Sequence, residues 1–254
     1  MYSVTHIVNA LSLGSPHFIS LLIAFGLANA IGLLEYFWAV ALTIREKKGP
    51  FPVWMHTFFL AHDSTAAVVF TWLALKYNFF WLFVVYGLGM YTWTVMEIYC
   101  LVMSIKYARQ EDWGSENSGP ISVKYATQQV IMQALVMYCI INVLRYLMQD
   151  TAMFLWLPMT NFVMAIGPGY VLNARRSREG SSVLVYIFIV LGTIINFAPQ
   201  GIGFFTSILP NVFNQPIWFA TGVIALIISI INLVRVVHLP AKKQNPKSKH
   251  RPVW

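Results

Sequence analysis

Three carboxylic acids stand inside long apolar stretches of this 254-residue chain: Glu35, Asp63 and Glu97. A charged side chain at the centre of a bilayer costs about 3 kcal/mol on insertion scales, so it generally faces a bundle interior or a wet cavity. There a protonated carboxyl can act as a general acid, and an ionised neighbour can stabilise developing positive charge. As a set the acids therefore predict a functional pocket, although each alone could simply hold neighbouring helices together.

The elements that must position these acids are seven predicted transmembrane helices. The chain is 58% hydrophobic and only 10% charged, whereas a soluble domain carries roughly a quarter charged residues. Apolar stretches of about 20 residues, each able to cross about 30 Å of hydrocarbon, recur along the whole chain. We predict an all-α, polytopic membrane protein with approximate spans Phe18–Thr43, Pro52–Leu75, Phe79–Lys106, Tyr125–Met148, Ala152–Leu172, Val183–Ile208 (interrupted at Asn196 and Pro199) and Ile217–Val237.

The distribution of positive charge indicates how these spans are oriented. Of the 17 Lys and Arg residues, 15 fall in three of the loops (one–two, three–four and five–six) or in the region from Arg235 to the C-terminus. By the positive-inside rule, this bias predicts an N-terminus outside and a C-terminus in the cytoplasm. We expect a seven-helix domain over residues 1–238 and a basic, disordered tail over 239–254. Such a protein is a multi-pass component of a bacterial inner membrane or of the endoplasmic reticulum.

The same loop and C-terminal residues account for the net charge of +8. Lys and Arg in these loops set the orientation of the spans and can contact anionic lipid headgroups. The expected partners are membrane lipid and a lipophilic substrate, not nucleic acid, and the oligomeric state stays open. His56 and His62 are six residues apart, hence on different faces of one helix, and no spacing typical of a metal site occurs. We therefore expect neither a metal nor another cofactor.

The three acids are predicted to share one layer of the membrane. They lie about 8, 11 and 9 residues from the cytoplasmic ends of spans one, two and three, which at about 1.5 Å per residue places them roughly 12–16 Å deep. Gln133 in the fourth span reaches a similar depth. An interior polar pocket follows, because exposure of all three acids to lipid is implausible.

Aromatic and polar side chains of the same spans are the candidates for the pocket wall. Aromatic faces can stabilise a carbocation by cation–π attraction, and His62 could orient Asp63, although an ordinary packing role is open for each of these residues. The candidate substrate-binding residues are Trp54, Phe59, His62, Tyr91, Trp93, Gln133, Asn161 and Asn196.

Two stretches taken together carry a family resemblance. Trp54–Asp63 follows the short basic loop Arg45–Pro50, and the Arg/Ser/Gly-rich loop Asn173–Ser182 precedes an apolar span. The chain resembles the small seven-helix membrane-bound terpene cyclases of fungal meroterpenoid and indole-diterpenoid pathways, and their bacterial relatives. Length, number of spans and loop charges agree over nearly the whole chain, whereas the shared motifs are short.

This resemblance implies that the protein protonates a terminal epoxide or alkene of a prenylated substrate and so starts a cationic ring-closing cascade. Asp63 stands at the position of the family's acid in span two, and Glu97 at its acidic position in span three. The family's second key acid lies in the last span, where this chain has none and Asn232 is a weak substitute. Glu97 or Glu35 would therefore supply the partner of Asp63.

Two other classes of function use the same residues. A proton-coupled small-molecule transporter would use the buried acids as proton sites and Pro199 as a hinge. Pro199-Gln200 is similar to the dipeptide of PQ-loop transporters with a 3+1+3 layout, although the first half of this chain has no second copy. A non-enzymatic membrane interaction protein would use the acids only to bind neighbouring helices.

Overall fold

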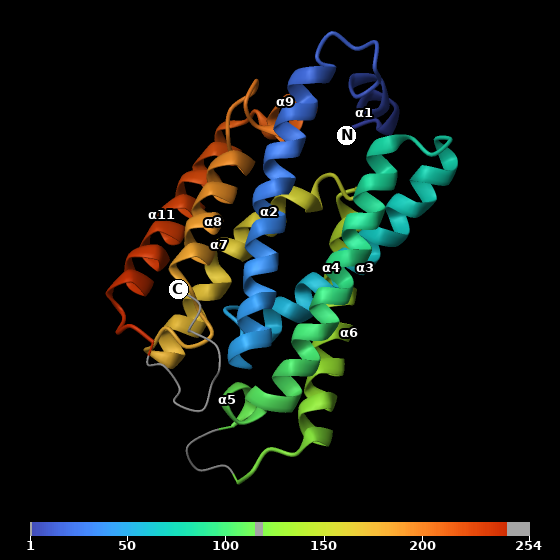
Figure 1. The fold of residues 1–254 in the computed structure, drawn as a ribbon. Helices are drawn as coiled ribbons and strands as arrows, with labels where there is room; N and C mark the ends of the chain where they lie inside the picture. Colours follow the sequence, from blue (N-terminus) through green and yellow to red (C-terminus); the bar gives the residue numbers. More distant parts are fainter. Residues whose placement is uncertain (1, 115–118, 243–254) are drawn as a thin grey trace.

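The described part of the chain is entirely helical. The structure is a computed structural model that describes residues 2–114 and 119–242, and it contains no strand within these ranges (Figure 1). The all-α prediction is confirmed, whereas most of the predicted tail lies outside the described residues. The helical elements are α1 (Val4–Ala10), α2 (Phe18–Glu46), α3 (Val53–Lys76), α4 (Trp81–Met103), the π-helical turn η1 (Ser104–Ala108), α5 (Arg109–Trp113), α6 (Val123–Leu147), α7 (Trp156–Arg175), α8 (Val183–Asn196), α9 (Phe204–Ile208), α10 (Pro210–Phe213) and α11 (Pro216–His238).

Several helices have the length and composition of membrane spans. Across residues 2–114 and 119–242, five segments qualify. Four are the single helices α2, α3, α6 and α11, and the remaining one, third in chain order, is the continuous helical run Trp81–Trp113, which comprises α4, η1 and α5. This set is compatible with a multi-pass membrane protein. The third segment continues past its predicted end at Lys106 to Trp113, and α7 begins four residues later than the predicted fifth span.

The predicted sixth span is not one helix, because α8 ends at Asn196 after only 14 residues. Pro199 has no N–H to continue a helix, and its carbonyl oxygen instead accepts hydrogen bonds from the amides of Ile202 (3.1 Å) and Gly203 (2.9 Å). Gly201 within this turn has a φ of 93°, which glycine adopts at little cost. The chain becomes helical again at α9.

The helices form two groups with α2 between them. Helix α3 packs against α4 and α6, while α7, α8 and α11 pack against one another. Helix α2 lies along α8 and touches α4 only lightly, so it joins the two groups (Figure 1). A cavity lined by α2, α3, α4, α7, α8 and α9, called the main cavity below, lies where these groups meet.

The buried Asp150 fixes the turn between α6 and α7. Its carboxylate accepts hydrogen bonds from the amides of Leu155 (3.0 Å) and Trp156 (3.1 Å) and from the Tyr2 hydroxyl. The amides of a helix N-terminus have no partner within the helix, so an acid there acts as a cap. Burial raises the pKa of Asp150 above its ordinary value, although these hydrogen bonds act in the opposite direction. The same contacts tie the N-terminal residues to this turn.

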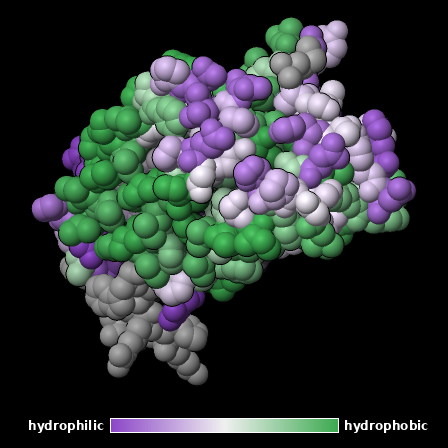
Figure 2. All heavy atoms as spheres, turned by 90° about the horizontal axis from the view of Figure 1, so that it is seen from above, coloured by the Kyte–Doolittle hydropathy of each residue, from purple (hydrophilic) through white to green (hydrophobic). Residues whose placement is uncertain are grey.

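The outer surface of the helices is strongly apolar. Large hydrophobic side chains of α6 are half exposed or more, including Ile131, Met132 and Leu135. Figure 2, seen from above, shows wide areas of hydrophobic side chains beside a gathering of hydrophilic ones. Such a surface is suited to lipid, since the helices satisfy their own backbone hydrogen bonds.

Candidate functional site

A cavity of about 130 Å³ lies between the two helix groups. Its wall is drawn from six helices, and the break after α8 contributes at both of its ends, through Asn196 and Phe205. A water molecule needs roughly 10–15 Å³ of such volume, so the cavity has room for several waters or for part of a ligand. The polar lining residues are Asn29, Glu35, Tyr36, His62, Asp63, Tyr86, Trp93, Thr160, Asn161 and Asn196.

Asp63 of α3 is 5% exposed and lines this cavity. Its Oδ1 lies 2.8 Å from Nδ1 of the neighbouring His62, and within the described residues its Oδ2 has no hydrogen-bond partner. The His62 ring stacks on Phe58, with 6.2 Å between ring centroids, and meets the edge of Trp156. The histidine therefore fixes one carboxyl oxygen and leaves the other for the cavity.

Glu35 of α2 lines the same cavity at 3% exposure. Within the part of the chain that the structure describes, its Oε1 has no hydrogen-bond partner. Gly192 of α8 lies beside it, since a Cβ at Gly192 would be in ordinary van der Waals contact, at 3.6 Å, with Oε2 of Glu35 and with Oδ1 of Asn161. A buried polar atom without a partner is rare and points to a functional role.

Glu97 of α4 is fully buried behind the cavity wall, so the third acid does not line the cavity. Its Oε1 accepts a 2.6 Å hydrogen bond from the Tyr36 hydroxyl, and its Oε2 lies 2.5 Å from Nδ1 of His56. The sequence predicts a similar depth for the three acids, but Glu35 and Asp63 line the cavity whereas Glu97 does not. Of the two hydrogen-bond partners of Glu97 among the described residues, Tyr36 lines the cavity and His56 does not.

Sequence reasoning missed Tyr36, which both lines the cavity and binds Glu97. A helical pattern could have found it. The cavity-lining residues of α2 recur with the period of one helix face, and such a face places side chains on one neighbour. These residues are Ala28, Asn29, Gly32, Glu35 and Tyr36.

The other predicted binding residues divide into two sets. Phe59, His62, Trp93, Asn161 and Asn196 line the cavity, and Nδ2 of Asn196 donates a 3.0 Å hydrogen bond to the Pro158 carbonyl, which fixes the end of α8 against α7.

Trp54, Tyr91 and Gln133 lie outside the cavity wall. Trp54 packs edge-on against Tyr170 at 5.9 Å between ring centroids, and Tyr91 is 47% exposed. Gln133 belongs to α6, which packs on the far side of α3. Its Oε1 is buried and has no hydrogen-bond partner within the described residues.

Asn232 of α11 also lies outside the cavity wall. Its Nδ2 donates a 3.0 Å hydrogen bond to the Ala165 carbonyl of α7 and so joins these two helices.

Aromatic rings form the remaining wall of the cavity. The Tyr36 ring meets Phe59 edge-on at 5.8 Å and Trp93 at 6.2 Å between centroids. Tyr86 stands on the same wall and packs edge-on against Phe25 at 5.2 Å. Aromatic faces attract cations, so this arrangement pairs an acid that can donate a proton with groups that can stabilise the resulting positive charge.

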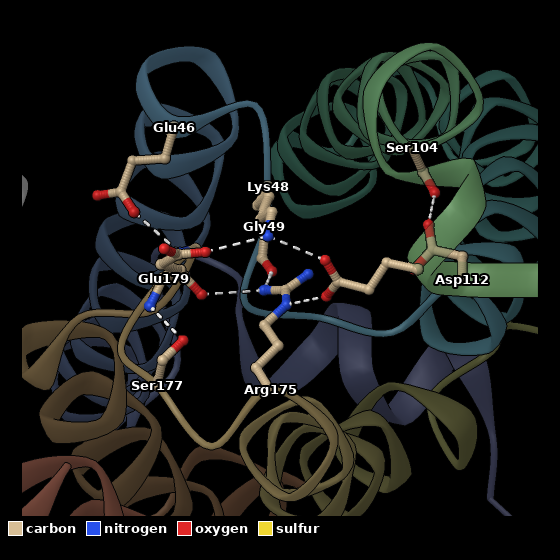
Figure 3. Close-up of polar contacts among 10 residues, drawn as sticks. Glu46, Lys48, Gly49, Ser104, Asp112, Arg175, Ser177 and Glu179 are labelled. Carbon is tan, nitrogen blue, oxygen red and sulfur yellow. Dashed lines mark hydrogen bonds and ion pairs between the residues drawn. The ribbon is translucent and has the colours of Figure 1, made fainter. Parts of the chain in front are cut away.

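An ionic network lies at the bundle end that is formed by the α2–α3 connection, α5 and the end of α7 (Figure 3). Arg175 of α7 pairs with Glu111 and donates a 2.6 Å hydrogen bond to the Gly49 carbonyl. Lys48 bridges Glu111 (3.0 Å) and Glu179 (3.1 Å). Burial alone lowers the pKa of Lys48, but the hydrogen bonds and charges of these two glutamates raise it above its ordinary value. The network ties the α2–α3 connection, the α7–α8 connection and α5 to the end of α7.

No protein-family model, curated protein or solved structure matches this chain.

Proposed function

We propose that this protein is a membrane-embedded terpene cyclase in which Asp63 starts ring closure by protonating an epoxide or alkene of a prenylated substrate. One observation carries the proposal: the Asp63 carboxyl is held at one oxygen by His62, 2.8 Å away, and lines a cavity with aromatic walls. The resemblance of Trp54–Asp63 and of Asn173–Ser182 to the seven-helix cyclases supports the same conclusion.

The proposed reaction is an isomerisation that begins and ends with a proton transfer. The Asp63 carboxyl gives its proton to the epoxide oxygen, and the C–O bond breaks as an alkene of the same substrate forms the new C–C bond. A carbon next to the final cation then releases a proton to a carboxylate, and the electrons of that C–H bond form the product alkene. Glu35 is the candidate acceptor, since it lines the cavity and has an unpartnered oxygen.

The cavity walls would keep the cation from being trapped. Water must be excluded during the cascade, because it would add to the cation. The aromatic rings of Tyr36, Phe59 and Trp93 line the cavity, and their π-faces can stabilise the cation without forming a covalent bond to it. Glu97 is separated from the substrate by Tyr36 and would act on Asp63 only through that residue.

The proposal includes seven spans, an outside N-terminus and a cytoplasmic C-terminus. Its support is that the three basic loops meet at one end of the bundle, where Lys48 contacts Glu111 and Glu179 and Arg178 donates to the Val237 carbonyl at 2.5 Å. The positive-inside rule assigns this end to the cytoplasm. In this topology α7 and the 14-residue α8 cross as the fifth and sixth spans, with the α8–α9 break facing the cavity.

A proton-coupled transporter of 3+1+3 type is the second candidate. The observation that favours it is the broken helix, because Asn196 before the break and Phe205 after it both line the cavity. Discontinuous helices of this kind form substrate sites in many transporters.

The two candidates separate in one pair of assays with the full chain in lipid. In nanodiscs, the cyclase converts prenylated aromatic epoxides or alkenes into cyclic isomers of unchanged mass, detected by chromatography with mass spectrometry. In liposomes, a transporter gives proton flux driven by a substrate gradient. Cyclic product without such flux supports the cyclase, whereas flux without conversion rejects it in favour of transport.

A further inference from the structure

We propose that Tyr36, Glu97 and His56 form a proton relay that connects Asp63 with a second, smaller cavity at the bundle end that carries Lys48 and Arg175. The inference rests on the proposed function only in taking Asp63 as the acid that must be reprotonated. It assigns a role to the Tyr36 hydroxyl and to His56, which the proposed chemistry leaves unused.

The three residues make a continuous hydrogen-bonded chain across three helices. The Tyr36 hydroxyl of α2 lies 2.6 Å from Oε1 of Glu97 on α4, and Oε2 of Glu97 lies 2.5 Å from Nδ1 of His56 on α3. All three side chains are buried, with exposures of 6%, 0% and 4% in that order. Both oxygens of Glu97 are thus engaged, one towards each cavity.

The outer end of the chain opens onto the second cavity. This cavity measures about 20 Å³, enough for a water molecule, and His56 is part of its wall. A Cβ placed on Gly49 would lie 4.0 Å from Nε2 of His56, and Gly49 lines the same cavity. Nε2 of the His56 imidazole therefore lies on the side of the second cavity, while Nδ1 faces Glu97.

The inner end of the chain lies on the main cavity. The Tyr36 side chain is part of that wall, together with Glu35 and Asp63. Phe51 and Phe59 pack against the Tyr36 ring, each at 5.8 Å between centroids. This packing leaves the hydroxyl as the polar contact between the main cavity and Glu97.

Titratable and charged groups surround both ends of the relay. The groups that line the second cavity with His56 are Lys47 and Lys48 of the α2–α3 connection, Cys100 of α4, Asp112 of α5 and Arg175 of α7. Those that line the main cavity with Tyr36 are Glu35, His62, Asp63 and Tyr86. Lys48 and Glu111 are each about one-third exposed, so the outer group of charges is in contact with solvent.

Each transfer in the relay is balanced by the next. A proton from water in the second cavity binds Nε2 of His56, and the proton on Nδ1 moves to Oε2 of Glu97. The Tyr36 hydroxyl turns from Oε1 of Glu97 towards the main cavity and passes its proton through water to the Asp63 carboxylate. The Glu97 carboxyl then turns and gives the proton received from His56 to the Tyr36 oxygen, which restores the Tyr36 hydroxyl. One proton enters and one leaves, with no other bond changed.

A purely structural bridge predicts a different result from a relay. If the three residues only joined α2, α3 and α4, their loss would alter stability but not the rate at which Asp63 takes up a proton. Tyr138→Phe provides a matched control, since the Tyr138 hydroxyl of α6 also makes a 2.6 Å hydrogen bond to a neighbouring helix, to Ser64 of α3, but lines neither cavity.

The test follows protonation of Asp63 directly in the full chain in nanodiscs. A pH jump is applied, and the carboxyl C=O band that Asp63→Asn removes is followed by time-resolved infrared spectroscopy. The wild type is compared with Tyr36→Phe, His56→Gln and Tyr138→Phe. We expect protonation to be slowed roughly tenfold or more in the first two variants, to the same final extent, and to be unchanged in the third.

An unchanged rate in Tyr36→Phe overturns the relay, and so does a wild-type Asp63 band that does not respond to the jump. If Tyr36→Phe fails to fold, His56→Gln decides by the same criterion. The proposed function has a separate readout in product formation. Slowed protonation without cyclic product keeps the relay and rejects the cyclase, whereas cyclic product with unchanged protonation rates rejects the relay alone.

Discussion

The Tyr36 hydroxyl donates a 2.6 Å hydrogen bond to Oε1 of Glu97 and thereby separates that acid from the main cavity. The acids of the three spans consequently have different surroundings. Asp63 and Glu35 line the cavity, while Glu97 lies between a tyrosine and a histidine. In the proposed mechanism, one acid faces the substrate while another exchanges protons with the bundle end.

His62→Gln should lower turnover of a prenylated epoxide by roughly 10- to 100-fold without unfolding the protein. The imidazole holds Oδ1 of Asp63 at 2.8 Å and packs on Phe58 and Trp156, so its loss frees the carboxyl to rotate, and misplacement of a catalytic group is costly. Initial rates in nanodiscs measure the effect. A variant with wild-type turnover contradicts the orienting role of His62.

Glu35→Gln should keep or raise the thermal unfolding midpoint while changing the products. The Oε1 atom of Glu35 is buried and has no partner among the described residues, so an amide of the same shape loses no hydrogen bond at this atom. Loss of the proposed proton acceptor should reduce the main cyclic alkene and increase water-quenched alcohols. Differential scanning fluorimetry and product analysis check both parts, and an unchanged product spectrum removes Glu35 from the mechanism.

Arg175→Ala should destabilise the protein far more than Lys48→Ala does. The Arg175 side chain is 8% exposed and binds both Glu111 and the Gly49 carbonyl, whereas Lys48 is 33% exposed. Losing a hydrogen bond made by a buried charged group costs about 1.5–3 kcal/mol, and an exposed pair contributes about 1 kcal/mol or less. Unfolding of the two variants in detergent compares them, and equal destabilisation contradicts this description of the network.

Asp150→Ala should lower the free energy of unfolding by about 1–2 kcal/mol, the usual cost of losing an N-terminal cap. The variant removes the hydrogen bonds from the amides of Leu155 and Trp156 and from the Tyr2 hydroxyl. Tyr2→Phe removes only the last of these and should cost less. If both variants unfold like the wild type, Asp150 does not fix the start of α7.

The pH dependence of stability should change in Asp150→Asn. Burial raises the pKa of Asp150, so the folded protein binds this proton more tightly than the unfolded chain. The stabilisation is complete below the ordinary aspartate pKa of about 4 and is lost as the pH rises through the raised value. Thermal unfolding of the wild type and the variant across this window should show a smaller decline for the variant. Parallel curves contradict the shift.

The sequence was sufficient for the properties that depend on position along a helix. Helix rise alone places Glu35 and Asp63 at one depth, and the structure brings both to one cavity. Apolar composition predicts long helices, and five such segments occur in residues 2–114 and 119–242. The interruption at Pro199 is also visible in the sequence, because proline cannot donate the next helical hydrogen bond.

The direction in which a side chain points around its helix, and the neighbours against which that helix packs, could not be predicted in the same way. Tyr91 follows Met90 directly, yet Met90 lines the cavity and Tyr91 is exposed, because neighbouring residues of a helix point in different directions. Gln133 has a suitable depth but belongs to α6, which lies beyond α3. Tyr36 was hidden because a tyrosine in an apolar span is not costly in the way an acid is.

The most direct test of the central claim is the turnover of Asp63→Asn with a prenylated epoxide in nanodiscs. Glu179→Gln is the matched control, because it also converts an acid to an amide, but at a side chain that is 65% exposed and remote from the cavity. We predict that Asp63→Asn folds, keeps its unfolding midpoint and forms no cyclic product, while Glu179→Gln reacts like the wild type. Cyclic product at the wild-type rate from folded Asp63→Asn would contradict the account.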